Sequence, residues 1–196
     1  MARIADPDKM EGIKRAVMEC VTDFGYAGVS IASICEKAGV SPGYLYRYYK
    51  SKEELVQELV DSEMMAIINN FISDIDSSNT LFDAAYKTVK RLFMSANTDP
   101  MTAKFTAAVV KDFRIPSEER ADNYKSLFEL ADKCIQLGTK TGEINPDITG
   151  VEVLVVSFAL PFRYLSFSLE LDHEKRFTAE EAERISKICI NAFNFQ

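Results

Sequence analysis

Residues Ser30 to Leu55 read SIASICEKAGVSPGYLYRYYKSKEEL, and this stretch indicates a helix, a tight turn and a second helix. Ser30 is a good N-cap, and the apolar residues after it recur at the three- and four-residue spacing of one helical face. Gly39 suits the left-handed conformation that often ends a helix. Ser41 is then expected to cap a second helix, with Pro42 at the first helical position, where its missing N–H costs nothing.

The second helix is predicted to run from about residue 42 to residue 49 and to divide its side chains between two faces. Tyr44, Arg47 and Tyr48 lie at positions i, i+3 and i+4, so we expect them to share the outer face. Leu45 is expected to face the first helix. The outer face therefore presents two phenols and a guanidinium, which can bond phosphate oxygens and base edges.

Positive charge is concentrated in the same stretch. Residues 30–52 carry one acidic side chain, Glu36, and four basic ones, a net of +3 in a chain whose net charge is −7; the basic residues are Lys37, Arg47, Lys50 and Lys52. A positive island in an acidic protein is the expected footprint of a module that binds a polyanion. The alternative is a helical hairpin with an accidental basic edge, because short helix-turn-helix patterns often arise by chance.

Further residues complete a pattern that covers about the first third of the chain: Gly25-Tyr26, Ser30, Ile34, Ala38-Gly39-Val40-Ser41, Gly43, Leu45-Tyr46, Tyr48 and Lys50-Ser51-Lys52-Glu53-Glu54-Leu55. This pattern resembles the N-terminal signature of the tetracycline repressor (TetR) family of bacterial transcription regulators. The resemblance implies a three-helix DNA-binding domain, followed by a helical domain that dimerises and usually binds a small-molecule effector. It also implies that the effector releases the operator.

The resemblance assigns roles to single residues as well. Ser30 matches the family's phosphate-binding cap, and Lys52 matches the lysine that anchors the next helix on the DNA backbone. Ala32 stands where many members have arginine or lysine, so one contact is expected to be missing. The predicted DNA-contacting residues are Ser30, Ser41, Pro42, Gly43, Tyr44, Tyr46, Arg47, Tyr48, Lys50 and Lys52.

Length and composition are those of an ordinary soluble globular protein, with one large domain or two small ones. Hydrophobic residues make up 47% and charged residues 27% of the 196 residues. Residues 1–52 hold eight Lys/Arg against six Asp/Glu, whereas residues 53–196 hold 15 against 24, so the ends have net charges of +2 and −9. The resemblance implies a DNA-binding domain at 1–52 and a helical effector-binding and dimerisation domain at 53–196. The division of charge predicts that the acidic second domain points away from DNA.

Several classes of function lack support in the sequence. The four cysteines are far apart and there is one histidine, so neither a metal site nor a cofactor is expected. Catalytic motifs are absent, so we do not expect an enzyme. The N-terminus lacks an apolar run and the apolar run at 153–162 contains Pro161, which favours a core helix over a membrane span and a cytoplasmic location.

The fold class predicted is all-α, with about nine helices in total. Thr149 with Glu152, and Thr178 with Glu181, are capping boxes that begin the last two helices, at roughly 150–171 and 179–194. The first of these two helices is apolar around its whole circumference and must be covered on every side. We expect a second copy of the chain to cover part of it, in a four-helix homodimer interface about a twofold axis.

An effector pocket is predicted among the aromatic residues of the middle helices, although these residues could simply form the core. Pro161 should kink its helix and free a carbonyl near residue 157. Arg163 follows directly and needs an acidic partner or ligand. The candidate effector-binding residues are Phe82, Tyr86, Phe93, Phe105, Phe113, Tyr124, Phe128, Phe158, Phe162 and Arg163.

The function predicted is therefore that of a transcriptional repressor. A homodimer would bind a palindromic double-stranded operator and be released by a small apolar or amphipathic effector. The alternative is a helical ligand-binding or protein-interaction module that no longer binds DNA.

Overall fold

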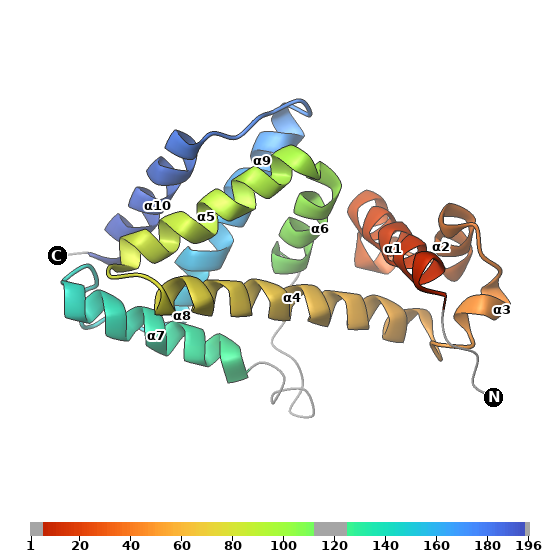
Figure 1. Ribbon diagram of the computed structural model, residues 1–196, viewed down its shortest axis with the longest axis horizontal. Coiled ribbons are helices and arrows are strands. Elements are labelled where there is room, and N and C mark those ends of the chain that lie inside the picture. The colour runs from red at the N-terminus through yellow and green to blue at the C-terminus, as the bar shows by residue number, and fades with distance from the viewer. Residues whose placement is uncertain (1–5, 112–124, 195–196) are drawn as a thin grey trace. The chain divides into compact units, whose positions relative to one another are not determined.

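The computed structural model describes residues 6–111 and 125–194, and every regular element in these ranges is helical, as the all-α prediction requires (Figure 1). The helices, in chain order, are α1 (Pro7–Gly28), α2 (Ile31–Ala38), α3 (Pro42–Leu45), α4 (Lys52–Asp76), α5 (Leu81–Thr98), α6 (Pro100–Lys111), α7 (Lys125–Thr141), α8 (Gly150–Leu154), the π-helix η2 (Val155–Ala159), α9 (Leu160–Leu171) and α10 (Ala179–Phe193).

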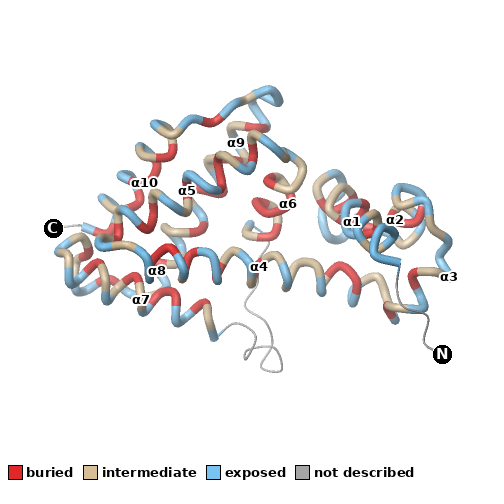
Figure 2. The backbone as a smooth tube through the Cα atoms, viewed as in Figure 1, coloured by how far each residue is buried: buried red, intermediate tan, exposed pale blue. Residues whose placement is uncertain are grey.

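The chain packs as two compact units, Met1–Glu63 (unit 1) and Met64–Gln196 (unit 2), and α4 begins in the first and ends in the second. In unit 1, α1 buries a stripe that includes Ile13, Val17 and Cys20, each 0% exposed. Ile34 of α2, also 0% exposed, completes this core. Figure 2 shows these buried segments of α1 and α2 in red. The helical periodicity read from the sequence thus places α1 and α2 against each other.

Unit 2 is built around the packing of α5 against α10 and α9. Phe93 of α5 is fully buried, with its ring centroid 4.7 Å from that of Phe177 and 5.6 Å from that of Tyr164. The Asn97 side chain joins the same elements, because its amide accepts the Phe177 N–H and donates to the Phe177 carbonyl, both at 2.8 Å. Aromatic packing and one bidentate amide therefore hold the end of α5 to the segment before α10.

The helix starts predicted at Thr149 and Thr178 are confirmed by their hydrogen bonds, and Thr80 caps α5 in the same way. Thr80, Thr149 and Thr178 each accept a backbone N–H from the residue three positions on, at 3.1, 3.3 and 3.2 Å. The carboxylates of Glu152 and Glu181 in turn accept the backbone N–H of Thr149 and Thr178. Both predicted capping boxes are therefore complete.

The penultimate helix departs from the single helix predicted at 150–171, because a π-helix separates α8 from α9. Pro161 explains the departure: it has no N–H and its ring clashes with the carbonyl four residues back, and a wider turn before it relieves that clash. By length and mean hydropathy alone, 1.4 over its most apolar window, Gly150–Leu171 could cross a membrane. In this structure it packs into unit 2 through Val153, Phe158, Phe162, Leu165 and Leu169.

Candidate nucleic-acid interface

The first helix of the predicted helix-turn-helix begins and ends where the sequence indicates. Ser30 Oγ accepts the Ser33 N–H at 3.0 Å, and Ser33 Oγ accepts the Ser30 N–H at 3.2 Å. At the other end Gly39 is left-handed, with φ of 64°, and its N–H points back to the carbonyls of Cys35 and Glu36. These two caps fix the length of α2 and the direction of the turn that leads to α3.

The second helix is shorter than predicted, because regular α-helix ends at Leu45 and not near residue 49. The chain continues as tight turns, with the Tyr48 N–H bonded to the Leu45 carbonyl at 2.9 Å. Pro42 occupies the first helical position as expected. Ser41 stands at the N-cap, but its side chain makes no capping hydrogen bond, so that part of the prediction was wrong.

Tyr44, Arg47 and Tyr48 lie together, as their spacing predicted. The two ring centroids are 5.3 Å apart, and the Arg47 guanidinium carbon lies 4.6 Å from the Tyr44 centroid and 6.0 Å from the Tyr48 centroid. Arg47 is exposed, whereas both tyrosines are half-buried. The rings thus hold the guanidinium at the surface, where it is available to a partner.

The opposite face of this segment anchors it in unit 1. Leu45 and Tyr49 are 1% and 7% exposed. The Tyr49 hydroxyl donates to Glu58 of α4 at 3.4 Å, and burial, with a smaller effect of Glu58, raises the pKa of Tyr49. Tyr49 therefore stays a neutral hydrogen-bond donor and ties the interface to the start of α4.

The remaining predicted contacts differ in their availability. Lys50 and Tyr46 are exposed, the latter by 57%, whereas Lys52 is half-buried with its ammonium 3.5 Å from Glu53. The spacing of Ser51 and Glu54 is that of a capping box. Ser51 Oγ accepts the Glu54 N–H at 3.2 Å, but the Glu54 carboxylate accepts the N–H of Lys50 and not that of Ser51. The local backbone is thus held rigidly beside both lysines.

Lys37 contributes less positive charge to this surface than the sequence count suggests. Its ammonium lies 3.2 Å from Asp23 and 3.3 Å from Glu19, both on α1. Hydrogen bonds to these carboxylates raise the pKa of Lys37. The side chain joins α2 to α1, and the accessible cations are left on and around α3.

The predicted effector-binding residues lie in different surroundings. Two of them, Phe113 and Tyr124, fall outside the described residues. Four are buried in unit 2, namely Phe93, Phe105, Phe158 and Phe162. The rings of Phe158 and Phe162 are stacked with their centroids 6.4 Å apart, and the centroid of Phe71 lies 6.1 Å from that of Phe158. Phe93 instead packs against Phe177 and Tyr164.

The other candidates lie nearer the surface. Phe82 and Tyr86 are half-buried and stacked, with their centroids 6.3 Å apart, and Phe128 is 55% exposed. Arg163 does not point into the core: it is exposed, 3.6 Å from the centroid of Phe167 and 3.8 Å from a carboxylate oxygen of Glu170. Its acidic partner is therefore on its own helix.

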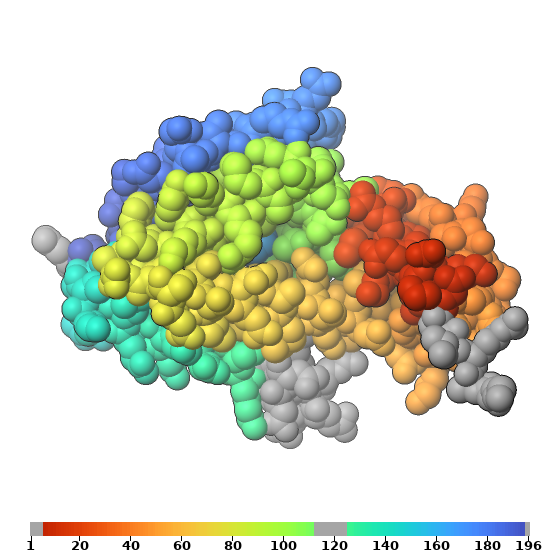
Figure 3. Space-filling view, in the orientation of Figure 1, coloured from red at the N-terminus to blue at the C-terminus, as the bar shows by residue number. Residues whose placement is uncertain are grey.

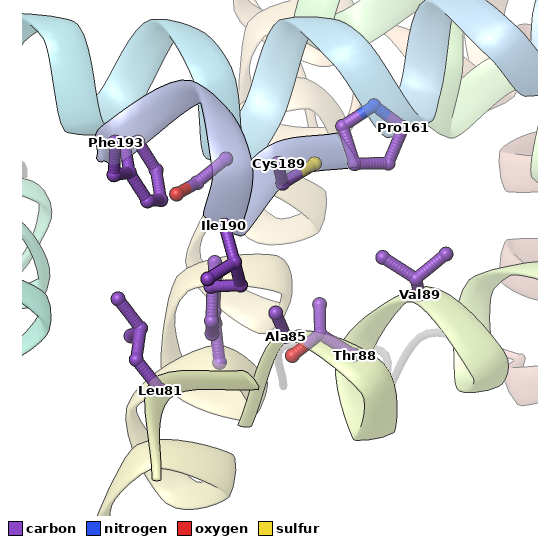
Figure 4. A pocket seen from close by; sticks show the side chains of 10 residues that line it. Leu81, Ala85, Thr88, Val89, Pro161, Cys189, Ile190 and Phe193 are labelled. Carbon is purple, nitrogen blue, oxygen red and sulfur yellow. The ribbon is translucent and has the colours of Figure 1, made fainter. Parts of the chain in front are cut away.

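A small apolar pocket in unit 2 lies between α5 and α10 (Figure 4). Ala85 and Val89 of α5 face Cys189 and Ile190 of α10, and Pro161 closes one side. None of the eight candidate residues that the structure describes lines it, and the room inside is about that of one water molecule. Sequence spacing could not locate it, because its walls come from helices distant along the chain.

The sequence is similar to those of known bacterial regulatory proteins. Residues 13–59, which include α2, α3 and the start of α4, match the family model described as bacterial regulatory proteins, tetR family. The chain is 24% identical over 140 residues to the fatty acid metabolism regulator protein of Bacillus subtilis, which covers 71% of this chain and 72% of that one. It is 21% identical over 136 residues to the HTH-type transcriptional regulator UidR of Escherichia coli, 69% of each chain.

Solved structures share the fold over nearly the whole chain. A TetR family transcription regulator from Marinobacter aquaeolei has a TM-score of 0.74 at 20% identity, covering 95% of this chain and 96% of its own. FadR from Bacillus subtilis, solved in complex with stearoyl-CoA, has a TM-score of 0.71 at 18% identity, covering 94% and 100%. At these identities the likeness concerns the fold alone.

Proposed function

This chain belongs to the tetR family of bacterial regulatory proteins, whose members are DNA-binding transcriptional regulators and not enzymes, and we propose that it is a repressor. As a homodimer in the cytoplasm it binds a palindromic operator through unit 1. A small apolar or amphipathic molecule that binds unit 2 changes the separation of the two α3 segments and releases the DNA.

This proposal rests on the exposure and the contacts of the Arg47 side chain. The guanidinium is exposed and held by two aromatic rings, and within the described residues no carboxylate pairs with it. An arginine held in place costs less entropy when it meets a base edge or phosphate than one that is free to move. Lys50 extends the positive surface beside it.

An electrophoretic mobility-shift assay tests the proposal. It uses promoter DNA from the neighbourhood of the protein's own gene and is run at two salt concentrations. The wild type should bind with a steep loss of affinity as salt rises, because phosphate contacts release counterions. Arg47→Ala combined with Tyr48→Phe should weaken binding without lowering the melting temperature, since both side chains lie outside the core. If the variant binds as the wild type does, a helical module that does not use this surface on DNA becomes the better account.

Dimerisation is proposed through α8, η2, α9 and α10. Their outer side exposes large apolar residues that unit 2 leaves uncovered, and the exposed fraction is 68% for Val151, 56% for Val155, 48% for Phe167 and 46% for Ile188. Single exposed apolar residues are ordinary, but Val151 and Val155 lie four positions apart, on consecutive helical turns, and exposed apolar surface that is contiguous marks protein interfaces. A second copy would also supply the second half-site contact that a helix as short as α3 requires.

The effector is proposed to be a molecule with a long hydrocarbon chain. Support comes from the similar Bacillus subtilis proteins, one named a fatty acid metabolism regulator and one solved with stearoyl-CoA. The aromatic candidates of unit 2 are the proposed lining. Stearoyl-CoA at about 100 times its Kd should stabilise the protein by about 2.7 kcal/mol and release DNA, whereas free coenzyme A should do neither. A melting temperature unchanged by any acyl chain length would count against this effector class.

A further inference from the structure

Lys9 lies beside the proposed DNA-binding surface although it is far from α3 in the sequence. Its ammonium nitrogen is 5.5 Å from the centroid of the Tyr44 ring, which also lies 4.6 Å from the Arg47 guanidinium carbon. Figure 3 shows the atoms of α1, in red, directly against the orange atoms that follow in the same unit. One half-buried ring of α3 therefore carries two cations, one of which comes from α1.

The first turn of α1 gives Lys9 a fixed position. Asp6 caps the helix by accepting the N–H groups of Asp8 and Lys9 at 3.2 and 3.5 Å, and Pro7 takes the first helical position. The Lys9 ammonium is 3.9 Å from Asp6, and both side chains are about half exposed, by 56% and 48%. A surface pair of this length holds an ammonium weakly. The ammonium can therefore exchange Asp6 for a stronger anionic partner.

The Tyr44 hydroxyl is turned inward. Its oxygen is buried and has no hydrogen-bond partner among the described residues, so it is in no position to bond an external phosphate. The ring of Tyr44 can still contribute to the surface, because its electron-rich face attracts the two cations beside it. This corrects the expectation that the hydroxyl itself contacts DNA.

Two cations near one ring also repel each other. Lys9 and Arg47 lie within about 10 Å, because each is close to the same centroid, and this is about one Debye length at 0.1 M salt. A phosphate beside Lys9 offsets this repulsion and gains a charge-assisted contact with the ammonium. A polyanion is thus the partner whose charge the cluster matches.

We propose that Lys9 is part of the DNA-binding surface, where it binds a backbone phosphate next to the position contacted by Arg47, and that Tyr44 is a positioning residue whose ring holds both cations. This inference rests on the proposed function. Phosphate contacts add affinity on every sequence, whereas base contacts discriminate between sequences. Lys9 therefore adds affinity and Arg47 adds selectivity.

The test is a DNA titration at several salt concentrations with matched variants. Lys9→Gln should reduce the slope of log affinity against log salt by about 0.9, the value for one phosphate, and weaken binding by the same factor on all sequences. Tyr44→Phe should bind as the wild type does, because the ring remains. Tyr44→Ala should lose more affinity than Lys9→Gln, and adding Lys9→Gln to it should change little further.

The matched control is Lys90→Gln in unit 2, where the ammonium lies 5.4 Å from the Tyr86 centroid and should not affect DNA binding. Wild-type slope and affinity in Lys9→Gln would overturn the role of Lys9, and a loss in Tyr44→Phe equal to that in Tyr44→Ala would overturn the positioning role of the ring. A wild type that binds DNA without salt dependence would instead overturn the proposed function, and the role of Lys9 with it. Should Tyr44→Ala unfold, Lys9→Gln still decides the role of Lys9, and Tyr44→Leu, which keeps apolar bulk without an aromatic face, decides that of the ring.

Discussion

At the scale of single residues, the fold of this chain does not require a glycine at position 43. A Cβ added there would meet no atom within 4 Å, and its φ is not in the left-handed region. Glycine in a helix is less stable than alanine by about 0.5–1 kcal/mol, so a structural reason for it is missing. The open space in front of Gly43 suits a backbone that must approach another molecule closely.

Gly43→Ala is therefore expected to change stability and binding in opposite directions. The free energy of unfolding should rise by up to about 1 kcal/mol, since the unfolded chain loses conformational freedom. DNA affinity should fall, because the added methyl group stands between α3 and the duplex. Urea unfolding and DNA titration of the same preparation measure both; an alanine variant that binds DNA as well as the wild type would show that nothing approaches Gly43.

The cysteines Cys134 and Cys189 are buried thiols of unit 2, and burial raises the pKa of each to about 12. Cys189 Sγ also lies 3.8 Å from the Val156 carbonyl of η2, which it contacts as a donor. At pH 8 both are neutral thiols, and the thiolate is the reactive form. A redox-sensing role for them is therefore not favoured.

Alkylation of these two cysteines at pH 8 should be at least about a thousandfold slower than that of a free thiol, from the ionised fraction alone. Because the folded-state pKa lies above the unfolded one, the thiols stabilise the fold fully below about pH 9. That contribution is lost as pH rises towards about 12. Iodoacetamide labelling read by mass spectrometry tests the first point, and rapid labelling of either residue in the folded protein would contradict it.

At the scale of elements, the sequence predicted those helix starts and ends that depend on contacts between neighbouring residues. The caps at Ser30, Thr149 and Thr178 and the stop at Gly39 depend on residues within four positions, so spacing was enough to find them. The π-helix before Pro161 was predicted only as a kink, because helical periodicity does not distinguish the two. The contact of a cation from α1 with the α3 ring was not predicted, because it depends on how distant segments pack.

Glu143 caps a helix that is distant from it in the sequence, and this contact too depends on how distant segments pack. Its carboxylate, in the loop after α7, accepts the N–H groups of Leu81 and Phe82 at the start of α5, at 2.7 and 2.8 Å. It also accepts the hydroxyl of Thr141. A half-buried carboxylate at a helix N-terminus satisfies free N–H groups and complements the helix dipole.

Glu143→Gln should destabilise the fold by about 1–3 kcal/mol, because one charge-assisted acceptor of two N–H groups becomes a neutral amide. Glu152→Gln is the matched control: it alters an exposed capping box within one helix and should cost about 1 kcal/mol or less. Urea unfolding followed by circular dichroism compares the two. Equal losses in both variants would show that Glu143 caps no more than a local turn.

At the scale of the whole molecule, the account depends on two copies of the chain. Val155, on the π-helix, is 56% exposed, and the Thr139 side chain of α7 is exposed as well. A carboxylate placed in a dimer interface would be buried without a partner, which costs several kcal/mol.

Val155→Asp is thus expected to give a monomer with weakened DNA binding and an unchanged helical spectrum. Thr139→Asp, which adds the same charge on α7, a helix outside the proposed interface, should stay dimeric. Sedimentation equilibrium of both variants at several concentrations measures the effect. A Val155→Asp protein that sediments as the wild type does would place the dimer interface on another surface.

The most direct measurement is a selection of bound duplexes from randomised DNA by the wild-type protein and by Arg47→Ala. The account predicts that the wild type enriches an inverted repeat with its half-sites about one helical turn apart, since a symmetric dimer presents α3 twice. Arg47→Ala should lose the preference at the position that Arg47 contacts in each half-site. Enrichment of no sequence by the wild type, or of the same sequence to the same degree by both proteins, would contradict the account.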